Sequence, residues 1–416
     1  MKYLPRIVDY ELQERLQQSG AVLVTGPKAC GKTETARQIA ESEVRIDTDP
    51  SVSIAMQSDP NLLLKGKTPR LIDEWQEQPQ IWNYARHEID NRQKEGQFIL
   101  AGSANPVESV RLHSGAGRFS RLRMRPLSWW ESGWSSGEVS LASLLKGDVP
   151  SSNLLDTSLE KIAEHIVAGG WPALIGKSLR NAARYNLDYL SLIAEMDVSR
   201  VSDRKRDPLK IHRLLESYAR NIATPASVST LTLDTTGEDG SLARTTVIDY
   251  LDVLSRLMIV EDLPAWNVHL RSKAALRTTP KRHLVDPSLA VAALGADVES
   301  LLADVVFLGF LFESEVLRDL RVYSQFLDAT LCHYRDSKRR ESDIILQLPN
   351  NSWAAFEVKL GFGGADEGAA SLLRVAREVD DSRIGKLLAL TVITGFGFAH
   401  RRPDGVNVVP LATLKT

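Results

Sequence analysis

The segment from residue 26 to residue 33 constrains the fold more than any other part of this chain. It reads Gly-Pro-Lys-Ala-Cys-Gly-Lys-Thr and fits the pattern G-x-x-x-x-G-K-[S/T] at every fixed position. An apolar run, Ala21–Thr25, precedes it, and a helical pattern at 34–42 follows it. A strand, a glycine-rich turn and a helix in that order place backbone N–H groups around a phosphate, at the positive end of the helix. The sequence therefore predicts a P-loop in an α/β domain.

A P-loop predicts that ATP and Mg²⁺ are bound. We expect Lys32 to reach the β- and γ-phosphates and the Thr33 hydroxyl to ligate Mg²⁺. The alternative, a chance match in an ordinary loop, is disfavoured by the strand and helix on either side. The expected nucleotide-binding residues are Gly26, Pro27, Lys28, Ala29, Cys30, Gly31, Lys32, Thr33 and Glu34.

A second apolar run, at 70–74, ends in two acids. Asp73 is predicted to bind Mg²⁺ through water, in the manner of a Walker-B residue. Glu74 is predicted to act as the general base that polarises the attacking water. The alternative is a strand that ends in a solvated acidic turn, but the position forty residues after a P-loop favours the catalytic interpretation.

Two further features are candidates for contact with the γ-phosphate. Ser103 follows the apolar run at 98–101 and is predicted to sense the γ-phosphate, with Asn105 as a weaker choice and a simple turn as the alternative. Arg118 or Arg121 is predicted to stabilise the transferring phosphoryl group, within the chain or across a subunit interface. The alternative for these arginines is a solvated basic edge.

Length and composition limit the class of protein. A chain of 416 residues exceeds one ordinary hydrophobic core and predicts two to four domains. The formal net charge of −2 argues against a strongly basic nucleic-acid coat, so that any contact with nucleic acid needs a local patch. Two isolated cysteines and the lack of a long apolar run predict a cytoplasmic protein with no membrane segment.

The residues after the first domain predict a mostly helical region and then a helix-turn-helix. A Ser- and Gly-rich stretch at 135–153 is expected to be a linker, and 154–206 to be mostly helical. Helices are expected at 211–222, 227–233 and 241–257, with wing strands at 258–264 and 281–286. Residues 243–246 would face double-stranded DNA if it is bound, and domain packing alone is the alternative. A basic patch suited to phosphates is expected at Arg271, Lys273, Arg277, Lys281 and Arg282.

The last part of the chain contains acids in an order that resembles the PD-(D/E)xK nucleases. Glu315 lies in a predicted helix, Asp343 in one strand, and Glu357 and Lys359 in the next. Glu357 and Lys359 alternate by two and therefore share one face of the strand. Metal ligation is expected from Glu315, Asp343 and Glu357, and Lys359 would position or deprotonate a water molecule. The alternative is a scaffold of the same fold that has lost its activity.

The motifs together resemble a group of uncharacterised bacterial and archaeal AAA-type ATPases that end in a domain of unknown function. The resemblance rests on the P-loop, Leu-Ile-Asp-Glu at 71–74, Ala-Gly-Ser-Ala at 101–104, Arg-Pro-Leu-Ser at 125–128, Gly-Gly-Trp-Pro at 169–172 and Glu-Val-Lys at 357–359. It implies an α/β AAA-type P-loop domain at 1–145, a helical lid at 146–207, a winged helix at 208–290 and a restriction-endonuclease-like α/β domain at 291–416.

Two functions fit these expectations. In the first, ATP hydrolysis drives a protein that acts on DNA, as in repair or defence. In the second, the ATPase is a signalling or regulatory switch whose C-terminal domains bind protein partners. An arginine acting across an interface would require a homo-oligomer, and the sequence leaves the oligomeric state open.

Overall fold

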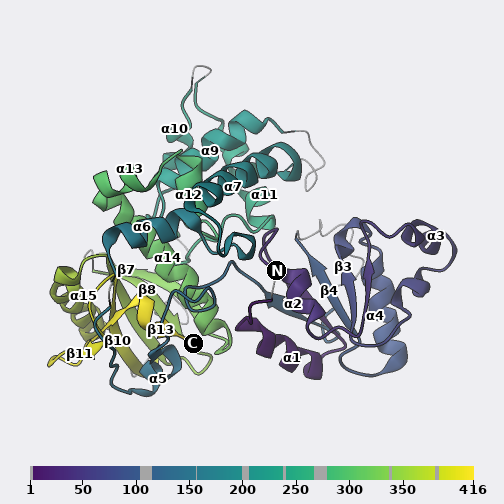
Figure 1. Cartoon of the computed structure of the whole chain (residues 1–416), viewed down its shortest axis with the longest axis horizontal. Coiled ribbons are helices and arrows are strands. Elements are labelled where there is room, and N and C mark those ends of the chain that lie inside the picture. Colours follow the sequence, from purple (N-terminus) through teal and green to yellow (C-terminus); the bar gives the residue numbers. More distant parts are fainter. Residues whose placement is uncertain are drawn as a thin grey trace. The chain divides into compact units, whose positions relative to one another are not determined.

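The computed structural model describes residues 3–103, 115–155, 157–198, 206–237, 240–266, 279–336, 340–379 and 384–416 (Figure 1). The chain forms two compact units. The first comprises Met1–Pro126 with Asp197–Arg204 and Val253–Met258, and the second comprises Leu127–Met196, Lys205–Asp252 and Ile259–Thr416. Among the described residues, no helix is long and apolar enough to span a bilayer.

The first unit is built on a five-stranded sheet in the order β2-β3-β4-β1-β5, in which every neighbouring pair is parallel. The predicted α/β fold of this part of the chain is confirmed. The strands are β1 (Ala21–Thr25), β2 (Ser42–Arg45), β3 (Arg70–Asp73), β4 (Phe98–Gly102) and β5 (Phe119–Arg123).

Both faces of this sheet are covered by helices, because its side chains alternate between two apolar clusters. In β1, Leu23 belongs to one cluster while Val22 and Val24 belong to the other. One side is covered by α1 and α2 and the other by α3 and α4 (Figure 1). The helices are α1 (Val8–Gln18), α2 (Lys32–Arg37), α3 (Ser51–Ser58) and α4 (Ile81–Arg92).

The second unit begins with helices and contains the three expected around 211–257. These are α9 (Pro208–Arg220), α10 (Val228–Asp234) and α11 (Arg244–Arg256). In place of two wing strands, the structure has two isolated antiparallel bridges, Val260 with Leu284 and Leu263 with Lys281. The other helices before the second sheet are α5 (Leu141–Lys146), α6 (Leu159–Ala168), α7 (Leu179–Leu192), α12 (Ser288–Ala293), α13 (Val298–Ala303) and α14 (Val305–Gln325).

A six-stranded mixed sheet, in the order β11-β12-β10-β9-β8-β7, forms the rest of the second unit. β8 pairs antiparallel with both β7 and β9. β10 pairs parallel with both β9 and β12. In Figure 1, α14 and α15 (Ala365–Glu378) lie on opposite sides of this sheet. Its strands are β7 (Thr330–Arg335), β8 (Glu341–Gln347), β9 (Trp353–Lys359), β10 (Leu387–Thr394), β11 (His400–Arg401) and β12 (Asn407–Pro410).

The expectation of a linker at 135–153 is wrong. β6 (Val139–Ser140) pairs in parallel with β13 (Leu414–Lys415) near the end of the chain. The Ser140 hydroxyl then accepts a hydrogen bond from the Ser143 backbone and caps α5. The small polar residues of this stretch therefore serve as strand and cap rather than as a flexible connection.

Candidate functional site

The P-loop occupies the turn between β1 and α2, and backbone geometry explains its fixed glycines. A Cβ atom at Gly26 would lie 2.5 Å from the Met124 carbonyl oxygen, so no larger residue fits there. Gly31 has a φ of 103°, in the left-handed region that glycine adopts without steric cost. The loop therefore turns tightly at the carboxyl edge of the sheet and leads into the amino end of α2.

Lys32 and Thr33 make contacts within the P-loop and with the end of β3. The Lys32 ammonium donates to the carbonyl oxygens of Gly26 and Pro27, at 3.0 and 2.8 Å, and the residue is only 6% exposed. The Thr33 hydroxyl donates to a carboxylate oxygen of Asp73 at 2.9 Å. A hydroxyl and a carboxylate at this spacing are the oxygen donors that Mg²⁺ takes in P-loop enzymes, so the residues present fit a magnesium site.

The end of β3 supplies the two predicted acids. Asp73 is 2% exposed, and burial, together with the nearby Glu74, raises the pKa of its carboxyl group. Glu74 has a φ of 52°, which is uncommon for a residue with a side chain and turns it out of the alternation of the strand. The side-chain amide of Gln76 donates to the Glu74 carboxylate.

Gln76 is a residue of the site that sequence reasoning missed. Its side chain packs against the end of β4, where a Cβ atom at Gly102 would lie 2.3 Å from the Gln76 amide oxygen. Glycine at that position therefore leaves room for the amide that holds Glu74. Two separate segments, after β3 and at the end of β4, together fix the direction of the proposed general base.

Ser103 lies at the same edge of the sheet as the P-loop. The register pairs Thr25 of β1 with Gly102 of β4, and Ser103 follows directly and is 3% exposed. Its contact with a γ-phosphate stays a prediction. Asn105, the weaker choice, lies outside the described residues.

Arg118 lies at the opposite edge of the sheet from the P-loop. Its carbonyl oxygen accepts from the Ala21 backbone, at the start of β1, and its guanidinium pairs with Asp90 of α4 at 2.9 Å. The five residues of β1 separate the two edges by about 16 Å. Arg121, the other choice, pairs with Leu23 in the middle of the strand and is exposed. An arginine finger from Arg118 within the same chain is therefore incorrect, and only the arrangement across a subunit interface stays open.

A buried arginine near the N-terminus donates hydrogen bonds to the P-loop backbone and to a neighbouring segment. Arg6 is 5% exposed and donates to the carbonyl oxygen of Cys30 at 2.9 Å and to that of Arg125 at 2.8 Å. It thereby ties the P-loop to the strand end beside it. The sequence gives no signal for this role, because the three positions are far apart along the chain.

The acidic residues of the second unit surround a lysine. The Lys281 ammonium donates to Glu313 at 2.7 Å and to Asp343 at 2.9 Å, and all three side chains are nearly buried. Burial lowers the pKa of Lys281, but Asp343 and Glu313 outweigh that effect and raise it. Burial, followed by the charge of Asp343, raises the pKa of Glu313 to about 7. The cluster is thus stabilised by an ammonium group.

The predicted metal site does not fit these residues. One oxygen of Asp343 accepts from Lys281, and the other accepts from the Val358 backbone at 2.9 Å. Glu357 is 3.4 Å from the Lys359 ammonium, and burial, followed by Asp343, raises its pKa to about 8. Among the described residues, no group of three acidic, histidine or cysteine side chains is arranged to hold a metal ion. Lys281 provides the positive charge that a divalent cation would supply.

Glu315 lies in a different cluster from Asp343, and the prediction that it ligates the same metal is wrong. Its carboxylate accepts from the Trp129 indole and from Arg318, the latter at 2.6 Å. Arg318 also pairs with Asp286 and Asp319, both at 2.8 Å. The Trp129 backbone N–H donates to Asp319, so this buried network holds the segment after residue 126 to α14. Glu313, two residues earlier in α14, lies beside Asp343 instead.

Two of the five residues of the expected basic patch, Lys281 and Arg282, are paired with acids. Arg282 is buried and pairs with Asp262, and Lys281 is enclosed by acids as described. Arg271, Lys273 and Arg277 lie outside the described residues. Residues 243–245, at the start of α11, are exposed.

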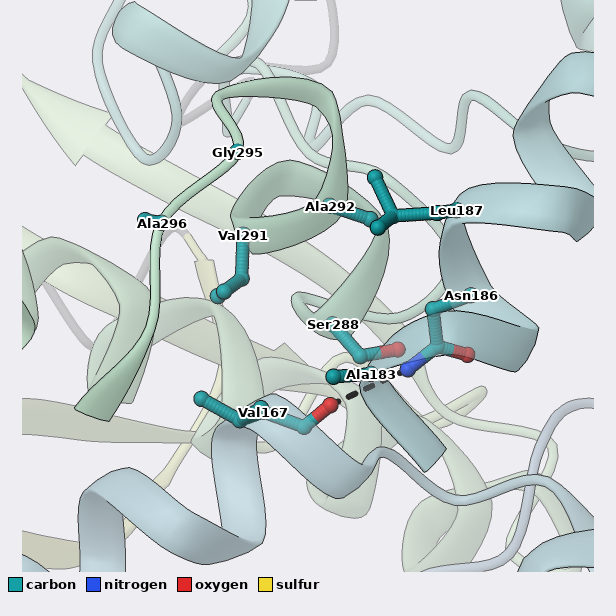
Figure 2. Close-up of a pocket in the computed structure, with 9 residues that line it drawn as sticks. All are labelled: Val167, Ala183, Asn186, Leu187, Ser288, Val291, Ala292, Gly295 and Ala296. Atoms are coloured by element: carbon teal, nitrogen blue, oxygen red, sulfur yellow. Dashed lines mark hydrogen bonds between the residues drawn. The ribbon is translucent and has the colours of Figure 1, made fainter. Parts of the chain in front are cut away.

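Two pockets of the second unit differ in chemistry. One is lined by Glu357 and Lys359 together with Arg340, Glu341, Glu367, Ser371 and Arg374, and has charged walls. The other lies among α6, α7 and α12 and has mostly apolar walls (Figure 2). There the Asn186 amide donates to the Val167 carbonyl at 3.0 Å, a contact that joins α7 to α6. The apolar pocket is lined by no ionisable side chain.

Three family models match successive parts of the chain. Residues 18–132 match an AAA domain, residues 159–300 a domain of unknown function (DUF8612), and residues 308–414 another domain of unknown function (DUF4143). The expected order of an AAA-type domain followed by uncharacterised domains is therefore confirmed. Two uncharacterised proteins, from Mycobacterium tuberculosis and Mycobacterium bovis, are each 25% identical over 97% of this chain and 83% of their own.

Solved structures give weaker likenesses. The Walker-type ATPase paby2304 of Pyrococcus abyssi has a TM-score of 0.40 at 11% identity, over 68% of this chain and 94% of its own. A DNA polymerase III gamma subunit-related protein of Thermotoga maritima has a TM-score of 0.21 at 12% identity, over 61% of this chain and all of its own. TM-scores this low do not establish a common fold.

Proposed function

We propose that the chain is a Mg²⁺-dependent ATPase that binds and hydrolyses ATP at the P-loop of its first unit. The hydrogen bond from Thr33 to Asp73 carries this proposal, because it brings the P-loop hydroxyl and the acid of β3 to one point. The match of residues 18–132 to an AAA domain supports it.

Each side chain of the P-loop site has a separate role in the proposed hydrolysis. Lys32 exchanges its two carbonyl partners for the β- and γ-phosphates, and backbone N–H groups of the loop hold the phosphate oxygens. Thr33 and Asp73 would hold Mg²⁺, which when bound neutralises charge on the phosphates. Glu74, held by Gln76, accepts the proton of the attacking water, and Ser103 lies close to the edge where the γ-phosphate would end.

Nucleotide binding tests the first half of this proposal. Lys32→Ala removes the ammonium group and is expected to weaken the binding of Mg²⁺-ATP at least tenfold. Arg37→Ala, on the exposed side of the same helix, is the matched control and should bind ATP like the wild type. Equal affinity of Lys32→Ala and wild type would place the nucleotide elsewhere.

We also propose that the second unit is a scaffold that binds a partner and does not cleave nucleic acid. Lys281 carries this proposal, since its ammonium lies between the carboxylates that a nuclease would use for a metal. ATP binding and hydrolysis then act as a switch on this unit, in keeping with a regulatory role rather than a nuclease role in repair or defence.

Double-stranded DNA is the partner to test first, because residues 243–245 are exposed at the start of α11. A DNA-acting switch predicts that DNA stimulates ATP turnover, with a strong dependence on salt. If DNA neither stimulates ATP turnover nor binds at low salt, the partner of the second unit is a protein. Nicking in Mg²⁺ or Mn²⁺ that Lys359→Ala abolishes would contradict the scaffold.

A further inference from the structure

A lysine of the P-loop is paired with an acid that lies far away in the sequence. Lys28 is the third residue of the loop, and its ammonium lies 2.5 Å from a carboxylate oxygen of Asp197. The Lys28 side chain is 43% exposed, whereas that of Asp197 is 8% exposed. The two residues are 169 positions apart, so no local pattern in the sequence relates them.

Asp197 lies where a π-helix ends and the chain returns to the first unit. It is the last residue of a five-residue π-helix, Ile193–Asp197, that follows α7. It is also the first residue of the segment by which the chain returns from the second unit to the first. Single turns of π-helix occur mostly at functional positions, because their hydrogen bonding is poorer than that of an α-helix.

We propose that Asp197 competes with the triphosphate of ATP for Lys28, so that nucleotide binding breaks the pair and loosens the turn that follows α7. This inference rests on the proposed ATP site. Lys28 belongs to the loop that surrounds the phosphates, and a triphosphate carries more negative charge than one carboxylate. The Lys28 side chain is 43% exposed, so its ammonium has room to turn from the carboxylate to a phosphate.

Because Asp197 is buried, the transfer of Lys28 to the triphosphate is expected to move the backbone around Asp197. A carboxylate that loses its cation cannot stay buried without a large cost, so Asp197 must become solvated when Lys28 leaves it. Solvation of Asp197 requires the π-helical turn to open. Because coupling between two interactions is reciprocal, the pair weakens ATP binding by the same factor by which ATP weakens the pair.

Affinity for a non-hydrolysable ATP analogue with Mg²⁺ tests the competition. Asp197→Asn keeps the shape but removes the charge, and is expected to tighten binding about fivefold, at the lower end of typical coupling. Asp197→Glu keeps the charge and should bind like the wild type. In a Lys28→Ala background, Asp197→Asn should change the affinity less than twofold. Unchanged or weaker binding by Asp197→Asn would overturn the competition.

Hydrogen exchange of residues 193–198 tests the movement. The wild type should exchange faster with the analogue bound than without it. Lys28→Ala, which removes the cation from Asp197, should exchange fast in both conditions. Slower or equal exchange of the wild type with analogue would overturn the inference even if Asp197→Asn fails to fold. If the wild type does not bind the analogue at all, the proposed ATP site itself fails, which is a distinct result.

Discussion

Removal of the Lys281 ammonium should destabilise the second unit strongly at neutral pH. Lys281→Met keeps most of the side-chain volume but leaves Glu313 and Asp343 without their shared cation. Breaking a buried ion pair from one side typically costs about 3–5 kcal/mol.

Two features place the expected loss in free energy of unfolding at the lower end of that range. Glu313 has a pKa of about 7 and can take up a proton at neutral pH with little cost. Asp343 keeps the hydrogen bond from the Val358 backbone. We therefore expect a loss of about 3 kcal/mol at pH 8, which corresponds to a fall in Tm of roughly 6–10 °C for a unit of this size.

The assay is thermal and urea unfolding of the full chain at pH 8 and pH 5. At pH 5 the Glu313 carboxyl group, whose pKa is raised to about 7, carries a proton, so the difference from wild type should shrink. Lys281→Arg, which keeps the charge, is the control and should lose much less. Mn²⁺ should raise the Tm of Lys281→Met but not that of the wild type at this site, because only the variant has two carboxylates without a cation.

A loss below about 1 kcal/mol at pH 8 would refute this reasoning, since a buried pair of carboxylates cannot lose its cation without cost. A difference from wild type that is as large at pH 5 as at pH 8 would also refute it. Such a result would mean that Lys281 contributes through packing and not through charge.

Three further predictions concern other residues of the two units. Burial raises the pKa of both Glu315 and Glu357 to about 8, so their contribution to stability is fully present below about pH 4.5 and is lost as the pH rises through 8. The wild type should therefore melt at a lower temperature at pH 9 than at pH 6, and an equal or higher Tm at pH 9 would contradict these pKa values. Gln76→Ala should lower ATP turnover about tenfold without a change in ATP affinity, because it releases Glu74 and no phosphate contact; a loss of affinity alone would argue against this role. Arg118→Ala should change turnover less than twofold, since its guanidinium pairs with Asp90 at the far edge of the sheet, whereas a hundredfold loss that depends on protein concentration would show a subunit interface.

Local patterns predicted the first unit well. The P-loop lies within fifteen residues of the strand and helix that define it, and an acid at the end of an apolar strand reaches the P-loop edge of any parallel sheet. Arg118 was misplaced, because its role depends on the end of the sheet at which it lies. It directly precedes β5 and therefore lies at the amino edge of the sheet, away from the P-loop.

The second unit was harder to predict because its site depends on distant residues. Glu313 and Glu315 are two positions apart in α14, so their side chains point about 200° apart around the helix. The sequence does not show which of them lies beside Asp343. Lys281 is 62 residues from Asp343, and no spacing rule relates an ammonium at that distance to the acids that it neutralises.

The most direct test of the ATPase proposal is turnover of Mg²⁺-ATP by the wild type and by Glu74→Gln, with ATP affinity measured on the same samples. Glu74→Gln keeps the size of the side chain and a hydrogen-bonding partner for Gln76, but it cannot accept the proton of the attacking water. We predict that the wild type hydrolyses ATP and that Glu74→Gln binds ATP with similar affinity while losing at least a hundredfold in turnover. Wild-type turnover that persists in Glu74→Gln, or a wild type that binds no ATP, would contradict the account.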